Sequence, residues 1–199
     1  MVSVKRYLMM LPLLLLSLVG CDKEDIILSE RDTIEKYLTS TRRMVAEEEV
    51  GSVVEEEPLF YSTFGRYAYR HIVNYYEEGR DERTEVAWGD ELELRFNAYV
   101  FTGSEPSMSS LYWSNVEEVI ISFQQQSNSE LIWSSEPLRV KLGTTDIIEG
   151  LEMTLPGCRE GDSVQVYMTS GLAYGSKNLE LVPKNSMVAW YMTIEKVNK

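Results

Sequence analysis

Beyond residue 60, apolar residues alternate with polar ones, or run together, in several short segments. These segments are 67–73, 92–98, 116–123, 137–142, 164–168 and 187–194. Such runs are typical of β-strands, because successive side chains of a strand point to opposite faces of its sheet. Gly79 and the pair Gly89-Asp90 mark turns between them. We expect this part of the chain to form a β-sheet.

One segment among these runs has the spacing of a helix instead. Between Asp146 and Leu155, apolar residues recur at helical intervals, namely Ile147, Ile148, Leu151 and Leu155. Gly157 follows and predicts the end of a short helix. One short helix among many strands is an α+β arrangement. The expected fold is therefore an antiparallel β-sheet wrapped around this helix.

A second helical pattern precedes the strands. Its apolar residues are Ile34, Tyr37 and Leu38. Ser29, three residues before Asp32, is typical of an N-cap, so a helix is predicted over residues 30–44. This helix would be an N-terminal extension of the sheet domain. Whether it packs against that domain or stands free stays open at this point.

The segments on either side of this helix are polar. Residues 22–28 are expected to form a short charged tether. Residues 47–57 contain six glutamates around a few apolar residues, which is typical of a solvated acidic linker.

The first twenty residues have the features of an export signal. Lys5 and Arg6 precede an apolar stretch, 8–18, that is shorter than the ~20 residues needed to cross a bilayer. The stretch ends in Leu18-Val19-Gly20-Cys21, which resembles a lipobox, where a lipoprotein signal is cut once the cysteine carries lipid. The pattern predicts cleavage after Gly20 and lipidation of Cys21. An ordinary signal beside a chance cysteine is the alternative.

These patterns divide the chain into three parts. Residues 1–20 are the signal peptide, residues 21–58 the lipidated tether, helix and acidic linker, and residues 59–199 the sheet domain. The protein is thus expected in the cell envelope, held by lipid at the outer membrane. Asp22 would favour inner-membrane retention in some bacteria, whereas Lys23-Glu24-Asp25 resembles a surface-export signal of others, so the membrane and its face stay open.

Charge narrows the range of partners. The chain carries 19 basic and 32 acidic residues, and loss of residues 1–20, which hold Lys5, Arg6 and no acid, would change its net charge from -13 to -15. Such acidity excludes nucleic acid as an expected partner, because phosphates require a basic surface. It also repels anionic lipid head groups.

The reactive residue types are scarce. Cys158 has no disulfide partner once Cys21 is lipidated, and we interpret it as a small buried apolar residue. His71 is the single histidine and lies in a predicted strand. One histidine and one free cysteine cannot form a histidine-based metal site or a catalytic triad, so neither a metal nor another cofactor is expected. The oligomeric state is not indicated.

The second half of the chain carries a series of short motifs in a recognisable order. They are Gly89-Asp90 before the 92–100 strand, Ser134-Ser135-Glu136-Pro137, Leu142-Gly143, Ile147-Ile148-Glu149-Gly150-Leu151, Glu160-Gly161-Asp162, Leu172-Ala173-Tyr174-Gly175 and Val182-Pro183-Lys184-Asn185-Ser186. In this order and spacing the region 66–197 resembles the FKBP-type peptidyl-prolyl cis-trans isomerases. The resemblance implies a fold in which a sheet wraps a short helix. It also implies that proline-containing polypeptides are the partners.

The resemblance also implies a set of site residues. Those matching catalytic positions are Tyr174, whose hydroxyl would bond substrate, Ile148, whose backbone N–H would do so, and Phe96, which stands where tyrosine is usual. Those matching the apolar substrate cup are Ile147, Leu151, Val140, Trp190, Leu181, Val182 and Trp133. The alternative for each apolar position is that its side chain simply packs in the hydrophobic core.

This sequence departs from the family pattern in two further respects. Trp133 stands where the family has its pocket aspartate, so part of the polar lining is missing. About twenty to thirty residues, 104–131, are inserted where the family often has a tight connection, and 111–113 and 119–121 within them are expected to add a strand near the pocket. Three functions therefore stay in view. One is a lipid-tethered isomerase that acts on envelope proteins, and another is a non-catalytic peptide-binding or chaperone lipoprotein on the same fold. The third is an accessory surface lipoprotein whose inserted hairpin binds another envelope component.

Overall fold

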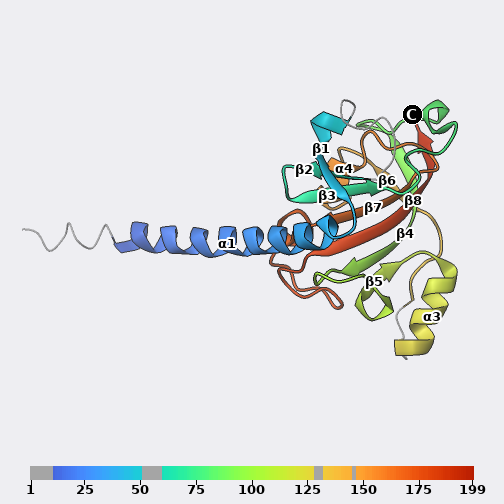
Figure 1. Cartoon of the computed structure of the whole chain (residues 1–199). Coiled ribbons are helices and arrows are strands. Elements are labelled where there is room, and N and C mark those ends of the chain that lie inside the picture. The colour runs from blue at the N-terminus through green and yellow to red at the C-terminus, as the bar shows by residue number, and fades with distance from the viewer. Residues whose placement is uncertain (1–10, 51–59, 128–131, 145–146) are drawn as a thin grey trace, which may run out of the picture.

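The computed structural model describes residues 11–50, 60–127, 132–144 and 147–199 (Figure 1). For residues 11–23 and for Phe60 it describes the backbone alone. The start of the predicted signal peptide, most of the acidic linker, the end of the insertion and Asp146 therefore lie outside the described residues.

The described strands form one sheet of eight strands in the order β1-β2-β3-β7-β8-β4-β5, with β6 also paired to β4. Their bounds are β1 Arg43–Ala46, β2 Phe60–Phe64, β3 Ala68–Ile72, β4 Glu91–Val100, β5 Leu111–Ser114, β6 Leu138–Lys141, β7 Ser163–Met168 and β8 Val188–Asn198. All neighbours are antiparallel except β1 and β2, which are parallel. The helices are α1 Leu11–Thr39, α3 Glu117–Ser127 and α4 Glu149–Thr154, with short 3-10 turns η1 Glu47–Glu49, η2 Arg80–Glu82, η3 Met108–Ser110 and η4 Ser170–Leu172. The predicted α+β fold is confirmed.

The main core lies between the sheet and α4. The alternation predicted for β4 holds, because its apolar residues are buried on one face while their neighbours are more exposed. Leu151 and Leu155 of α4 have no exposed surface and pack into the same core. A Cβ at Gly150 would lie 2.5 Å from Met168 Sδ, so glycine allows the close approach of α4 to β7.

The N-terminal helix covers the opposite face of the sheet. Ile34 and Leu38 are fully buried in a second cluster that includes Tyr69 and Tyr167. This cover explains why β3 is buried on both faces rather than alternating. The open question about this helix is thereby answered, because its C-terminal half packs on the domain. Its N-terminal part projects away from the sheet (Figure 1).

The predicted bounds of this helix were wrong. Ser29 lies inside α1 rather than at its N-cap, and the segment 22–28 is helical rather than a loose tether. At the other end α1 stops at Thr39, and Arg43–Ala46 forms β1. Pairing with β2 decides this end, because the backbone groups of β1 find partners in the sheet.

The described part of the inserted segment contains the 3-10 turn η3, the strand β5 and the helix α3. The expected strand at 111–113 is present as β5, which pairs with β4. The run 116–123 was predicted as a strand, but most of it lies in α3. Ile120 and Phe123 are buried whereas Ile121 is 47% exposed, so burial follows a helical face rather than every second residue.

Several polar groups are buried as paired structural elements. Arg80 donates to both carboxylate oxygens of Asp162 at 2.8 and 2.7 Å. Arg70 reaches Glu47 at 2.7 Å, and its other guanidinium nitrogen contacts Cys158 Sγ at 3.7 Å. Burial raises the pKa of the Cys158 thiol to about 11, in keeping with an unreactive core residue.

Within the described ranges, no helix has the length and apolar character required to cross a membrane.

Candidate functional site

A cavity of about 410 Å³ opens between the start of α4, the start of β8 and the inserted strand β5. Its walls are mostly apolar, with two charged side chains among them. It is lined by Trp113, Leu138, Ile147, Ile148, Glu149, Ala173, Tyr174, Lys177 and Trp190. This is the region in which the sequence predicted a substrate cup.

The back wall of the cavity is built by a row of residues across three strands. Trp190 of β8 and Trp113 of β5 both pair with Ala98 of β4, one on each side. The small side chain of Ala98 lets the two indoles approach to 5.6 Å between ring centroids, in an edge-on arrangement. Phe96 stacks on Trp190 at 4.5 Å and contacts Trp113 at 4.7 Å. Aromatic packing of this kind holds the wall rigid.

A chain of hydrogen bonds connects this wall to the tyrosine of the cavity. The indole Nε1–H of Trp190 donates to the hydroxyl of Tyr112 at 2.7 Å, and the hydroxyls of Tyr112 and Tyr174 lie 3.3 Å apart. An indole N–H is a donor only, so the oxygen of Tyr112 accepts and its own O–H is free to donate to Tyr174. The O–H of Tyr174 can then donate into the cavity.

The pKa directions agree with this polarity. Burial raises the pKa of Tyr112 well above its ordinary value, and the bond to Tyr174 raises it further, as expected for a donor. Burial also raises the pKa of Tyr174, while the bond from Tyr112 lowers it, as expected for an acceptor. Both phenols therefore remain protonated at neutral pH, and Tyr174 keeps a proton to donate.

The mouth of the cavity is formed by the N-terminus of α4. Ile148 is the N-cap of this helix, with extended backbone, and its carbonyl accepts from the N–H groups of Leu151 and Glu152 at 3.0 and 3.2 Å. Among the described residues, none accepts a hydrogen bond from the Ile148 N–H. This N–H lies at the position where the resemblance implies a contact with a substrate carbonyl.

A smaller hollow of about 220 Å³ adjoins the cavity and shares Trp113 and Tyr174 with it. Its other lining residues are Tyr112, Trp133, Leu179, Glu180, Leu181 and Val182. Trp133 stacks on Phe123 of α3 at 4.7 Å and so packs against the inserted segment. The predicted rim residues Leu181 and Val182 thus lie in the adjoining hollow rather than in the main cavity.

The predicted site residues are divided among three places. Ile147, Ile148, Tyr174 and Trp190 line the main cavity. Trp133, Leu181 and Val182 line the adjoining hollow. Phe96, Val140 and Leu151 are buried in the core behind the walls. The side chain of Cys21, the predicted lipidation site, lies outside what the structure describes.

Two of the residues that line the cavity were not identified from the sequence. Trp113 was assigned to the insertion, whereas the structure places it beside Phe96 and Trp190 on the strand that flanks β4. Leu138, two residues before Val140 on the same face of β6, lines the cavity, whereas Val140 is buried. The spacing of two along β6 could have pointed to Leu138 as an alternative to Val140.

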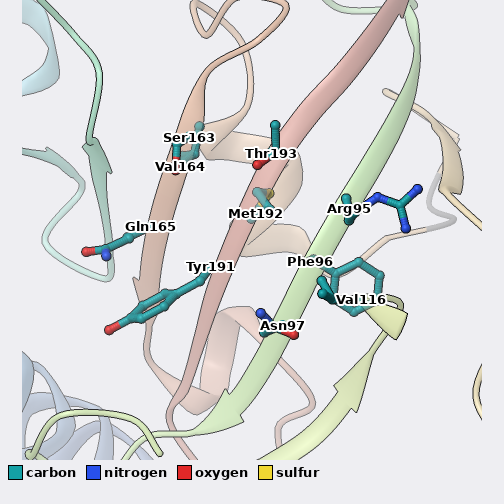
Figure 2. A pocket seen from close by; sticks show the side chains of 10 residues that line it. All are labelled: Arg95, Phe96, Asn97, Val116, Ser163, Val164, Gln165, Tyr191, Met192 and Thr193. Carbon is teal, nitrogen blue, oxygen red and sulfur yellow. The ribbon is translucent and has the colours of Figure 1, made fainter. Parts of the chain in front are cut away.

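A third hollow, of about 270 Å³, lies on the other face of the sheet and is shown in Figure 2. It lies over β7, β8 and β4, and polar side chains such as Gln165, Asn97 and Thr193 line it. The guanidinium of Arg95 at its edge is already bound to Glu195 at 2.5 and 3.3 Å and to two backbone carbonyls. Burial raises the pKa of Tyr191, which also lines this hollow, so its phenol stays protonated at neutral pH. Over the described part of the chain, no three His, Cys, Asp or Glu side chains cluster in a way that could hold a metal ion.

Comparison with known protein families finds one match. Residues 114–195 match the model of a family described as FKBP-type peptidyl-prolyl cis-trans isomerase. No curated protein sequence matches the chain. The match supports the FKBP-type isomerase family and a function of peptidyl-prolyl isomerase type, and the mixed sheet with its short helix is an FKBP-like α+β fold. The matched residues include α4, Tyr174 and Trp190, whereas α1 and β1–β4 lie outside the matched range.

Proposed function

We propose that this chain is a peptidyl-prolyl cis-trans isomerase whose active site is the 410 Å³ cavity. The observation that carries the proposal is the convergence of Trp190, Trp113 and Tyr174 on that cavity, with the tyrosine hydroxyl oriented to donate. The match of residues 114–195 to the isomerase family supports it independently.

The chemistry requires only binding and exclusion of water. The X–Pro bond rotates slowly because resonance gives it partial double-bond character, with a barrier of about 18–20 kcal/mol. Twisting the bond removes that resonance and makes the amide less polar. An apolar cavity therefore binds the twisted form better than the planar one, which lowers the barrier. The N–H of Ile148 and the hydroxyl of Tyr174 would hold the substrate backbone on either side of the ring.

A non-catalytic peptide-binding function is the second candidate, and one observation favours it. The residue at the position where the resemblance implies a carboxylate is Trp133, an aromatic side chain that lines the adjoining hollow. The resemblance implies an aspartate in the family's pocket. A cavity without it could hold a proline ring tightly and yet accelerate rotation little.

A protease-coupled assay on short X–Pro peptides separates these functions. We expect the wild-type chain to accelerate isomerisation and Tyr174→Phe to reduce kcat/KM by about 2- to 12-fold, the value of one hydrogen bond of 0.5–1.5 kcal/mol. Trp113→Ala should reduce it further, since Trp113 lines both hollows, whereas Trp133→Ala, which touches only the smaller one, serves as the matched control. Peptide binding with no acceleration by the wild type would leave only the binding function.

We further propose that the protein acts on polypeptides of the cell envelope while held to a membrane by lipid on Cys21. The support is the apolar stretch that ends in Leu18-Val19-Gly20-Cys21. Two acyl chains suffice for stable anchoring, whereas one gives only marginal binding. Expression of wild type and Cys21→Ser, followed by membrane fractionation, tests this. The variant should leave the membrane fraction, and equal membrane retention of both would contradict lipidation at Cys21.

A further inference from the structure

The N-terminal helix reaches the turn that carries the cavity tyrosine. The carboxylate of Glu30 accepts the backbone N–H of Ser170 at 2.7 Å through one oxygen and the hydroxyl of Ser170 at 2.7 Å through the other. Glu30 is only 7% exposed and Ser170 is buried. Gly171 lies against α1 as well, because a Cβ there would be 3.1 Å from Ile27 Cδ1. Glu30 is therefore bound to η4 in a site closed to water.

Ser170 in turn holds the backbone on both sides of Tyr174. Its carbonyl accepts the N–H of Ala173 at 3.1 Å and the N–H of Gly175 at 2.8 Å. The carbonyl of Gly175 accepts the N–H of Asn185 at 2.7 Å, which ties the same turn to the rim loop. Displacement of Ser170 would thus move the backbone from which the side chain of Tyr174 extends.

The position of Glu30 is fixed by the rest of α1. Glu35, on the same helix, accepts from the guanidinium of Arg66 at 2.9 and 2.7 Å and from the hydroxyl of Tyr69 at 2.8 Å. Ile34 and Leu38 are buried against the sheet. A helix docked at these points carries Glu30 to η4 as a rigid element, because residues four apart share one face.

We infer that α1 is part of the isomerase site and that Glu30 is the positioning residue for Tyr174. This inference rests on the proposed function for its catalytic consequence, but its structural consequence stands apart from it. Docking of α1 holds the turn at 170–175, and the turn aims the Tyr174 hydroxyl into the cavity. The family match begins at Ser114, so this control comes from the N-terminal extension of this chain.

Two variants of Glu30 separate hydrogen bonding from charge. Glu30→Gln keeps both bonds, because its amide oxygen accepts the Ser170 N–H and its amide nitrogen donates to the Ser170 hydroxyl. Glu30→Ala loses both. Val197→Ala is the control for general loss of stability. Val197 is a core residue near the C-terminal end of β8, whereas Val188, which pairs with Met168, lies at the other end of that strand. The Val197→Ala variant should leave the activity unchanged.

Hydrogen exchange of backbone amides in the full chain tests the structural step without any assay of activity. In Glu30→Ala we expect exchange at Ser170 and Gly175 to be about 2- to 12-fold faster, the value of one lost hydrogen bond. In Glu30→Gln and Val197→Ala these two amides should exchange as in the wild type. Unchanged exchange in Glu30→Ala would overturn the inference even if the wild type proved inactive.

A double-mutant cycle with Tyr174→Phe tests the catalytic step. If Glu30 acts through the tyrosine hydroxyl, Glu30→Ala reduces kcat/KM in the wild type but has no further effect in the Tyr174→Phe background. A purely structural role would give effects that multiply in the double variant. An active wild type with an unaffected Glu30→Ala variant would overturn the inference while leaving the proposed function intact. A wild type that does not accelerate isomerisation would instead count against the proposed function.

Discussion

The hydroxyl of Tyr112 is the group whose removal tests the architecture of the site most directly. It accepts the indole N–H of Trp190, a residue of the back wall, at 2.7 Å and lies 3.3 Å from the hydroxyl of Tyr174. Trp190 is 1% exposed and Tyr112 is 7% exposed, so both partners of this hydrogen bond are almost fully buried. Tyr112→Phe keeps the ring and removes this one oxygen.

The expected effect follows from the N–H that is left behind. A buried donor without a partner destabilises a protein by about 1–3 kcal/mol. For a chain of this size that corresponds to a fall in Tm of roughly 2–4 °C for each kcal/mol. The variant should also lower kcat/KM, because Tyr174 loses the donor that fixes the direction of its own O–H.

Urea unfolding and the indole N–H resonances of the four tryptophans provide the measurements. In Tyr112→Phe the Trp190 N–H signal should shift and exchange faster with solvent. Tyr99→Phe is the matched control, because Tyr99 lies on the adjacent strand β4 and its hydroxyl makes no hydrogen bond to a described residue. A loss below about 0.5 kcal/mol for Tyr112→Phe, within the range of ordinary surface substitutions, together with an unchanged Trp190 signal, would refute the hydrogen-bond chain.

Two further predictions concern groups outside the cavity. Burial raises the pKa of the Cys158 thiol to about 11, so a Cys21→Ser chain should resist thiol reagents at pH 8 and react fully in denaturant. The stabilising contribution of the protonated thiol should be lost as the pH rises above the pKa that this group has in the unfolded chain. Rapid labelling of the native chain would contradict the burial of Cys158. Hydrogen bonds from the Arg66 guanidinium lower the pKa of Glu35, so its stabilisation is complete at neutral pH and is lost as pH falls through that lowered value. Urea unfolding at pH 7 and pH 3 should therefore show a greater loss for wild type than for Glu35→Gln, and equal losses would argue against a stabilising role for the pair.

Local sequence patterns were enough to predict most of the sheet and the helix that it wraps. The alternation along β4 and the helical spacing of α4 depend on the period of each element, which the residues of one segment determine among themselves. The order of motifs through Tyr174 and Trp190 likewise indicated which segments would meet at the cavity, and both residues line it.

The tertiary structure alone decided which side chains form the walls. Trp113 lines the cavity because β5 pairs with β4 in a register that places Trp113 opposite Ala98. The pattern of apolar residues within 104–131 does not determine this register. The β-branched run in the insertion likewise became α3, in which Ile120 and Phe123 are buried. From the sequence alone, Glu30 would be interpreted as an ordinary acidic residue of the protein surface. Its contact with Ser170 arises from the docking of two segments far apart in the chain, and long-range packing of this kind is set by the surfaces that meet rather than by either segment alone.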